Sequence, residues 1–194
     1  MALQMLAANT GPLIPIGFSM GAIVALEMLR QDPVRVAALA LIAFNATADL
    51  PERAAVRPRQ QADVSAGNLV RVVANELKPH YLSSANTNND ALRTLTMDMA
   101  IALGPDTFVR QSEALRTRAD LQTVLRTIAV PTLLACGSDD VLCPPDWHVA
   151  WASAIGAHAT LSILPNAGHL LPIEQPAALA DLLIGWLQTR QDRS

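Results

Sequence analysis

The segment LIPIGFSMGAIVALEMLR, residues 13–30, decides the fold of this chain. Its first part, LIPIGF, is apolar and predicts a short buried strand, whereas AIVALEMLR consists of good helix formers and predicts a helix. Between them lies GFSMG, residues 17–21. A G-x-S-x-G sequence between a strand and a helix is typical of the nucleophile elbow, a strained turn that exposes a serine hydroxyl above a sheet. We therefore expect Ser19 on such a turn, with Gly17 and Gly21 both needed for close packing around it.

The composition indicates one domain that binds neither nucleic acid nor membranes. The chain has 194 residues, of which 51% are hydrophobic, enough to bury one sizeable core. Its formal net charge is −3 and Lys and Arg form no cluster, which argues against nucleic acid and anionic membranes as partners. No apolar run reaches transmembrane length, and the N-terminus lacks the basic residues of a signal peptide. The two cysteines, Cys136 and Cys143, have no metal-ligand spacing and fit a reducing compartment, so we expect a cytoplasmic protein.

Strand-like and helix-like patterns alternate at both ends of the chain. A helix between two apolar runs is the signature of a parallel βαβ unit, and the pattern predicts an α/β fold with a parallel sheet of about four strands and flanking helices. The predicted strands are Leu13–Phe18, Val36–Phe44, Val130–Cys136 and Ala159–Leu164, and the predicted flanking helices are Gly21–Arg30, Asp146–Ile155 and Pro176–Arg190.

The middle of the chain has another character. Strand-like runs are scarce there, and proline and asparagine interrupt several amphipathic stretches. The helices predicted in this part are Ala66–Leu77, Asp90–Leu103 and Asp106–Arg118. We therefore expect a helical cap or lid, residues 46–128, inserted into a core made of residues 1–45 and 129–194.

One of the four histidines has the sequence context of a catalytic base. A serine hydroxyl is a weak nucleophile until a base takes its proton, and a third group must hold that base. His169 follows a predicted strand through a turn, which places it where open α/β sheets build their sites. His80 falls in the helical insertion, whereas His148 and His158 flank a predicted surface helix, so we expect surface or capping roles for these three. The four histidines have no metal-site spacing, and we assign no metal.

The orienting carboxylate is expected at the end of another strand. Two aspartates, Asp139 and Asp140, follow the strand Val130–Cys136. Either is compatible with a plain turn after Gly137, because aspartate is a common turn residue. Asp140 is the better candidate for the acid, and Asp139 is the second.

Three motifs together resemble the α/β-hydrolase superfamily. They are GFSMG at 17–21, PTLLACGSDDVLCPP at 131–145 and PNAGHLLPIEQP at 165–176. The resemblance is to the esterase, lactonase and C–C hydrolase branch, and it covers nearly the whole chain, although the helical insertion matches only loosely.

The resemblance also assigns the triad. The acid of the family typically stands three residues after the glycine that ends the strand and three or four before a proline, which corresponds to Asp140 here. The family's histidine follows a small residue and a glycine, as His169 does. The order Ser19, Asp140, His169 is that of the superfamily.

The resemblance implies a serine hydrolase that uses no cofactor and no metal. Such an enzyme would cleave a small ester, thioester, lactone or activated C–C bond through an acyl-enzyme on Ser19, with the backbone N–H of Met20 in the oxyanion hole. The serine nucleophile disfavours a haloalkane dehalogenase, which uses aspartate, whereas a cofactor-free haloperoxidase with the same triad remains open. The candidate lid residues, which could equally pack between helices, are Tyr81, Met97, Met99, Leu103 and Phe108.

The resemblance further implies that the front of the fold is missing. In the family about four strands precede the elbow, and a loop among them supplies the second oxyanion donor, whereas this chain starts some twelve residues before its elbow strand. The strand Leu13–Phe18 would then be an exposed apolar edge, through which the chain could pair with a second copy. The alternative function is accordingly a truncated, non-catalytic or weakly active hydrolase remnant, derived from a mis-started, fragmentary or degenerate gene.

Overall fold

The computed structural model describes residues 1–191, which form a four-stranded parallel sheet surrounded by helices. The strands are β1 (Ile16–Phe18), β2 (Leu39–Ile42), β3 (Thr132–Gly137) and β4 (Ala159–Leu164), in the order β1-β2-β3-β4. The helices are α1 (Ala2–Ala8), α2 (Met20–Gln31), α3 (Pro51–Asp63), α4 (Leu69–Val72), α5 (Asp90–Arg116), α6 (Gln122–Leu125), α7 (Pro145–Ile155), α8 (Leu171–Glu174) and α9 (Pro176–Gln191). The α/β fold predicted from the sequence is thus confirmed. None of the described helices combines the length and apolar character that crossing a membrane requires.

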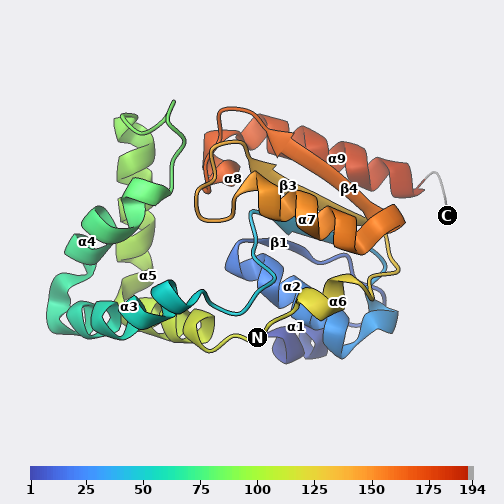
Figure 1. Ribbon diagram of the computed structural model, residues 1–194, viewed down its shortest axis with the longest axis horizontal. Helices are drawn as coiled ribbons and strands as arrows, with labels where there is room; N and C mark the ends of the chain where they lie inside the picture. Colours follow the sequence, from blue (N-terminus) through green and yellow to red (C-terminus); the bar gives the residue numbers. More distant parts are fainter. Residues whose placement is uncertain (192–194) are drawn as a thin grey trace.

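Helices cover both faces of the sheet (Figure 1). On one face, α2, α6 and α7 pack against the sheet through a large apolar cluster that includes Leu26, Leu41 and Leu125. On the other face, α9 places Trp186 against Leu133. Burial on both faces explains why β2 and β3 are apolar along their whole length, as parallel strands are when helices cover both sides.

The elbow strand lies at one edge of the sheet and is shorter than the sequence predicts. It begins at Ile16 rather than Leu13, because Pro15 has no N–H with which to continue the ladder. Leu13 still forms an isolated parallel bridge with Val36. Ile14 and Ile16 are 43% and 47% exposed, so this edge is apolar and partly open to solvent.

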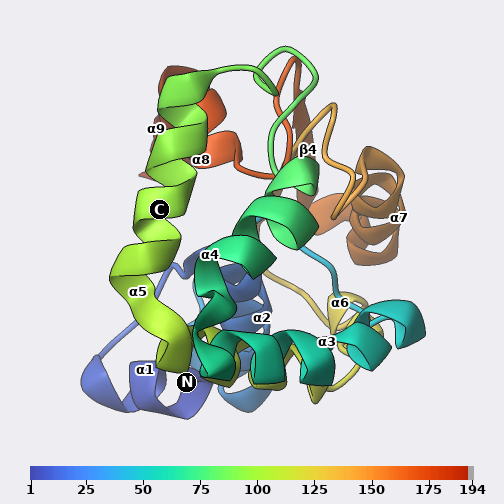
Figure 2. The same cartoon turned by 90° about the vertical axis from the view of Figure 1, so that its left-hand side faces the viewer.

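Three helices between β2 and β3 stand apart from the sheet, and we call them the cap helices: α3, α4 and α5 (Figure 1). Figure 2, which looks onto this side, shows α3 lying across one end of α5, and both α3 and α4 contact α5. The predicted break at Gly104 is present as a sharp kink within α5, where Gly104 has φ 76°. The sequence did not predict α3, because this strongly polar segment contains Pro58 in its interior.

The segment after α5 returns to the core. Leu121, Val124, Leu125 and Ile128 all belong to the large apolar cluster on the sheet. We therefore propose that the cap consists of α3 to α5 and that α6 belongs to the core, which places the end of the cap before Leu121 rather than at residue 128.

Candidate active site

Ser19 occupies a strained turn between β1 and α2. Its φ of 50° and ψ of −114° lie outside the helical and extended regions, and its N–H donates to the carbonyl of Ile42 at 2.8 Å. A Cβ atom at Gly17 would lie 2.3 Å from the carbonyl oxygen of Gly21, so only glycine fits there. A Cβ atom at Gly21 would meet nothing within 4 Å. The elbow geometry is therefore present, but the expectation that both glycines are sterically required is wrong for Gly21.

A chain of hydrogen bonds joins Ser19, His169 and Asp140. The Oγ atom of Ser19 lies 2.9 Å from Nε2 of His169, and Nδ1 of His169 lies 2.9 Å from Oδ2 of Asp140. The other carboxylate oxygen accepts hydrogen bonds from the N–H groups of Leu142 and Cys143, at 2.9 and 2.8 Å. Because a carboxylate only accepts, Nδ1 of His169 carries a proton toward it, and Nε2 is left to accept the serine proton.

The second candidate acid, Asp139, binds two serines rather than the histidine. It is half-buried, and its carboxylate accepts hydrogen bonds from the hydroxyl of Ser138, at 2.8 Å, and from the hydroxyl and N–H of Ser84, at 2.9 and 3.2 Å. These hydrogen bonds hold the pKa of Asp139 below its usual value, since they favour the charged form. Asp139 thus attaches the segment that precedes α5 to the core, and of the two aspartates only Asp140 contacts His169.

A carboxylate that the sequence analysis did not single out holds the histidine loop. Glu174, in α8, accepts hydrogen bonds from the N–H of Gly168 and the N–H of Ser83, both at 2.8 Å. A Cβ atom at Gly168 would lie 2.6 Å from the nitrogen of Ser83, so glycine permits the two loops to touch. The signal available in the sequence was a lone acid within the apolar stretch LLPIEQP, which follows the catalytic histidine candidate.

Two aromatic rings lie against the imidazole of His169. Its ring centroid is 5.5 Å from that of Phe18 and 6.3 Å from that of Tyr81. Phe18 comes from the elbow and Tyr81 from the segment before α5, so core and cap both contact the histidine. Burial raises the pKa of the Tyr81 hydroxyl, which therefore stays protonated.

His148 is not a surface residue, contrary to the expectation from its position in a flanking helix. It is fully buried, its Nε2 accepts from the N–H of Phe44 at 3.2 Å, and its Nδ1 lies 3.1 Å from the carbonyl of Pro144. Burial lowers the pKa of His148, so the ring remains neutral and ties the end of β2 to the start of α7. His158 is exposed as expected, whereas His80 lies in the insertion and lines the cavity described next.

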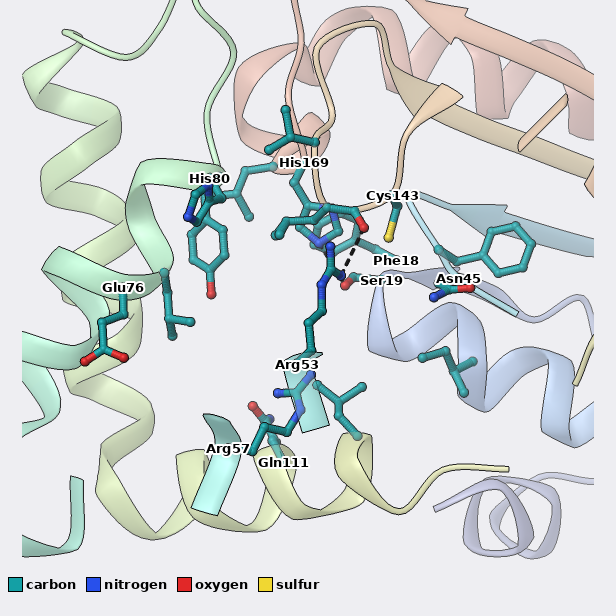
Figure 3. Close-up of a pocket in the computed structure, with 18 of the residues that line it drawn as sticks. Phe18, Ser19, Asn45, Arg53, Arg57, Glu76, His80, Gln111, Cys143 and His169 are labelled. Atoms are coloured by element: carbon teal, nitrogen blue, oxygen red, sulfur yellow. Dashed lines mark hydrogen bonds between the residues drawn. The ribbon is translucent and has the colours of Figure 1, made fainter. Parts of the chain in front are cut away.

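A cavity of about 750 Å³ opens above Ser19, between the sheet and the cap helices (Figure 3). Ser19 and His169 lie at its floor, which puts the hydrogen-bonded chain within reach of a small molecule. Of the five candidate lid residues, Tyr81 and Leu103 line the cavity, whereas Met97, Met99 and Phe108 are not among the described residues that line it. The full lining consists of Phe18, Ser19, Ile23, Phe44, Asn45, Arg53, Val56, Arg57, Gln60, Glu76, Leu77, His80, Tyr81, Leu103, Gln111, Leu115, Arg118, Val141, Leu142, Cys143, His169 and Leu170.

Asn45 contributes an unused donor to the cavity wall. Its Oδ1 accepts from the N–H and the hydroxyl of Thr47, at 2.8 and 2.9 Å, which fixes the orientation of the amide. The Nδ2 atom is buried and has no hydrogen-bond partner among residues 1–191. Figure 3 shows this amide nitrogen on the side of Asn45 that faces Ser19.

Three side chains of the site have the composition of a metal-binding group. Ligand atoms of Asp140, Cys143 and His169 lie within 4.8 Å of one another. However, the Nδ1 atom of His169 and the carboxylate of Asp140 already share a hydrogen bond. Burial also raises the pKa of Cys143 and keeps it a neutral thiol, a poor ligand. The geometry therefore favours the hydrogen-bonded chain over a metal centre.

The sequence profile described as "Alpha/beta hydrolase family" matches residues 2–182. This match spans nearly the whole chain and agrees with the elbow, the order of Ser19, Asp140 and His169, and the parallel sheet. The chain belongs to the α/β-hydrolase family.

Several proteins that resemble this chain carry the names of different activities. A thermophilic esterase from Thermogutta terrifontis, solved with malate bound, superposes with a TM-score of 0.88 at 27% identity, covering 96% of this chain and 68% of that one. BpoC of Mycobacterium tuberculosis, described as a candidate non-heme bromoperoxidase, is 30% identical over 91% of this chain and 71% of its own length. An enol-lactonase from Burkholderia xenovorans LB400 shares the fold, with a TM-score of 0.79 at 21% identity, over 96% of this chain and 68% of that one.

Proposed function

We propose that this chain is a serine hydrolase that cleaves a small ester, thioester, lactone or activated C–C bond through an acyl-enzyme on Ser19. The observation that carries the proposal is the continuous chain of hydrogen bonds from Ser19 through His169 to Asp140 at the floor of an open cavity. The names of similar proteins, an esterase and an enol-lactonase, support an ester or lactone as the bond that is cleaved. BpoC leaves a cofactor-free haloperoxidase as the second candidate, because it is similar over most of this chain.

In the proposed reaction, His169 takes the proton of the Ser19 hydroxyl and then gives it to the leaving group. Ser19 Oγ attacks the carbonyl carbon of the substrate while its proton passes to Nε2 of His169, and the carbonyl electrons move onto the oxygen. The tetrahedral intermediate collapses, and the leaving group takes the proton from Nε2 while the acyl group stays on Ser19. The leaving group is an alcohol, a thiol or, for an activated C–C bond, a carbanion. A water molecule then attacks the acyl carbon while one of its protons passes to Nε2. The second tetrahedral intermediate collapses, the carboxylic acid leaves, and the proton returns to Ser19. Asp140 holds the proton on Nδ1 and stabilises the imidazolium that forms.

We assign the backbone N–H of Met20 as a hydrogen-bond donor to the oxyanion. Met20 is the first residue of α2, so its N–H has no acceptor within the helix and remains available to a substrate oxygen. The positive end of the helix dipole favours negative charge at this point.

A fluorophosphonate probe tests the proposal, since it reacts only with an activated serine. The folded protein should be labelled on Ser19, the Ser19→Ala variant should not be labelled, and labelling of a control variant, Ser153→Ala on the exposed side of α7, should match the wild type. Labelling that persists in Ser19→Ala would refute Ser19 as the nucleophile. Absence of label on the wild type would favour the alternative, a non-catalytic remnant.

A further inference from the structure

The cap side of the cavity carries three arginines: Arg53, Arg57 and Arg118. Two of them are paired with the same carboxylate. Arg57 lies 2.6 Å from Asp49, and Arg118 lies 3.2 Å from it, while the Asp49 side chain is only 1% exposed. One buried carboxylate thus compensates two guanidinium groups, which leaves this pair of arginines with an excess of positive charge.

Arg53 is the arginine without an acidic partner. Its Nη1 donates to the backbone carbonyl of Leu142 at 3.2 Å, and among the described residues it takes part in no ion pair. Figure 3 shows its side chain extending from α3 across the cavity toward Ser19 and His169. The hydrogen bond to Leu142 uses one of the five donors of a guanidinium group, so the remaining N–H groups are available to a ligand.

Among the lining residues that the structure describes, Glu76 is the one acid, and it does not neutralise Arg53. Glu76 lies 2.6 Å from Arg59 and 3.4 Å from Arg71, and the hydrogen bond with Arg59 lowers the pKa of Glu76 to about 2. Its charge is therefore committed to arginines outside the cavity lining. Asp140 is buried behind His169 and does not line the cavity. Among the described lining residues, three arginines thus stand against one acid, although the chain as a whole is negative.

We propose that Arg53 binds a carboxylate of the substrate, so that the preferred substrates are esters or lactones whose acyl part carries a second, free carboxylate. This inference rests on the proposed serine hydrolase function. A guanidinium group binds a carboxylate through two parallel hydrogen bonds, and a partly enclosed cleft strengthens that pair relative to bulk water. A cavity of about 750 Å³ accommodates such a small molecule together with the reacting ester.

Two esters that differ only in charge test the inference. We would measure kcat/KM for p-nitrophenyl hydrogen glutarate and for its methyl ester, which has the same chain without the free carboxylate. The wild type should prefer the anionic ester, and Arg53→Gln should reduce that preference roughly ten- to hundredfold by slowing only the anionic substrate. The matched control is Arg110→Gln, which removes an exposed arginine of the cap helix α5 that lies outside the cavity lining and donates to Thr107, and which should leave the ratio unchanged. The preference should also weaken with added salt.

A structural role for Arg53, through its contact with Leu142, predicts a different result. Both esters would then lose rate equally, and an unchanged ratio in Arg53→Gln would overturn the inference. If the folded wild type hydrolyses neither ester, the proposed serine chemistry fails, and calorimetric binding of monomethyl glutarate decides the inference separately. Binding that is lost in Arg53→Gln and kept in Arg110→Gln would support the anion site, whereas binding that is absent or independent of Arg53 would refute it.

Discussion

Replacing Asp140 by asparagine should abolish turnover by reversing the tautomer of His169. The N–H groups of Leu142 and Cys143 both donate to Oδ1 of Asp140, so the oxygen of an asparagine amide will take that position. Its NH₂ group then occupies the position of Oδ2, 2.9 Å from Nδ1 of His169. An amide donor there requires Nδ1 to be an acceptor, which places the proton on Nε2, facing Ser19. Such a histidine cannot take the serine proton.

The expected loss is about 10⁴-fold in kcat, the size of the effect when the orienting acid of a serine triad becomes an amide. Turnover of a p-nitrophenyl ester at pH 7.5 measures it, and circular dichroism shows whether the variant folds. The matched control is Asp139→Asn, whose amide oxygen can still accept from Ser84, and which should change kcat by no more than about two- to threefold. A folded Asp140→Asn variant that retains more than about a tenth of the wild-type kcat would refute the reasoning, and a larger loss in Asp139→Asn would transfer the role to Asp139.

Three further predictions concern the framework of the site. Gly17→Ala should lower the free energy of unfolding in urea by at least about 1–3 kcal/mol, because its methyl group would meet the backbone of the elbow. Gly21→Ala should be tolerated. Equal effects of the two substitutions would contradict the close approach at Gly17. Burial lowers the pKa of His148, so the unfolded chain binds a proton that the folded protein does not, and stability should fall as pH decreases below about 6.5, by up to about 1.4 kcal/mol per pH unit. His148→Gln should flatten this dependence and His158→Gln should not. Ile16→Lys should reduce any self-association seen by light scattering, since Ile16 is 47% exposed on the edge strand; unchanged association would exclude pairing through β1.

The sheet was predictable because its signals are local. The run Leu39–Ile42 is apolar without interruption, and a strand buried on both faces needs that composition. The elbow was predictable for the same reason. The turn at Ser19, which has φ 50°, brings the backbone of Gly21 against Gly17, and these residues are only four positions apart. These features depend on residues adjacent in sequence.

The parts that sequence analysis missed depend on contacts between distant residues. His148 has the sequence context of a surface helix, and only the position of Phe44, 104 residues earlier, makes it a buried acceptor. Glu174 is likewise one acid in an apolar segment until Ser83 and Gly168 approach it. The helix α3 was missed for a local reason, because Pro58 in its interior is a signal against a helix.

Polar contacts join the cap to the two loops that carry Asp140 and His169, and so connect the shape of the cavity with the position of the His169 imidazole. Glu174 accepts a hydrogen bond from Ser83, and Asp139 accepts hydrogen bonds from Ser84. Asp139 is adjacent to Asp140, and Glu174 also accepts from Gly168, which is adjacent to His169. Movement of the cap away from the sheet must break these hydrogen bonds and withdraw Tyr81 from the imidazole of His169. By thermodynamic linkage, a ligand that binds in the cavity and favours the closed position of the cap also favours the observed position of the His169 imidazole. We therefore expect ligand binding in the cavity and the position of the His169 imidazole to be coupled.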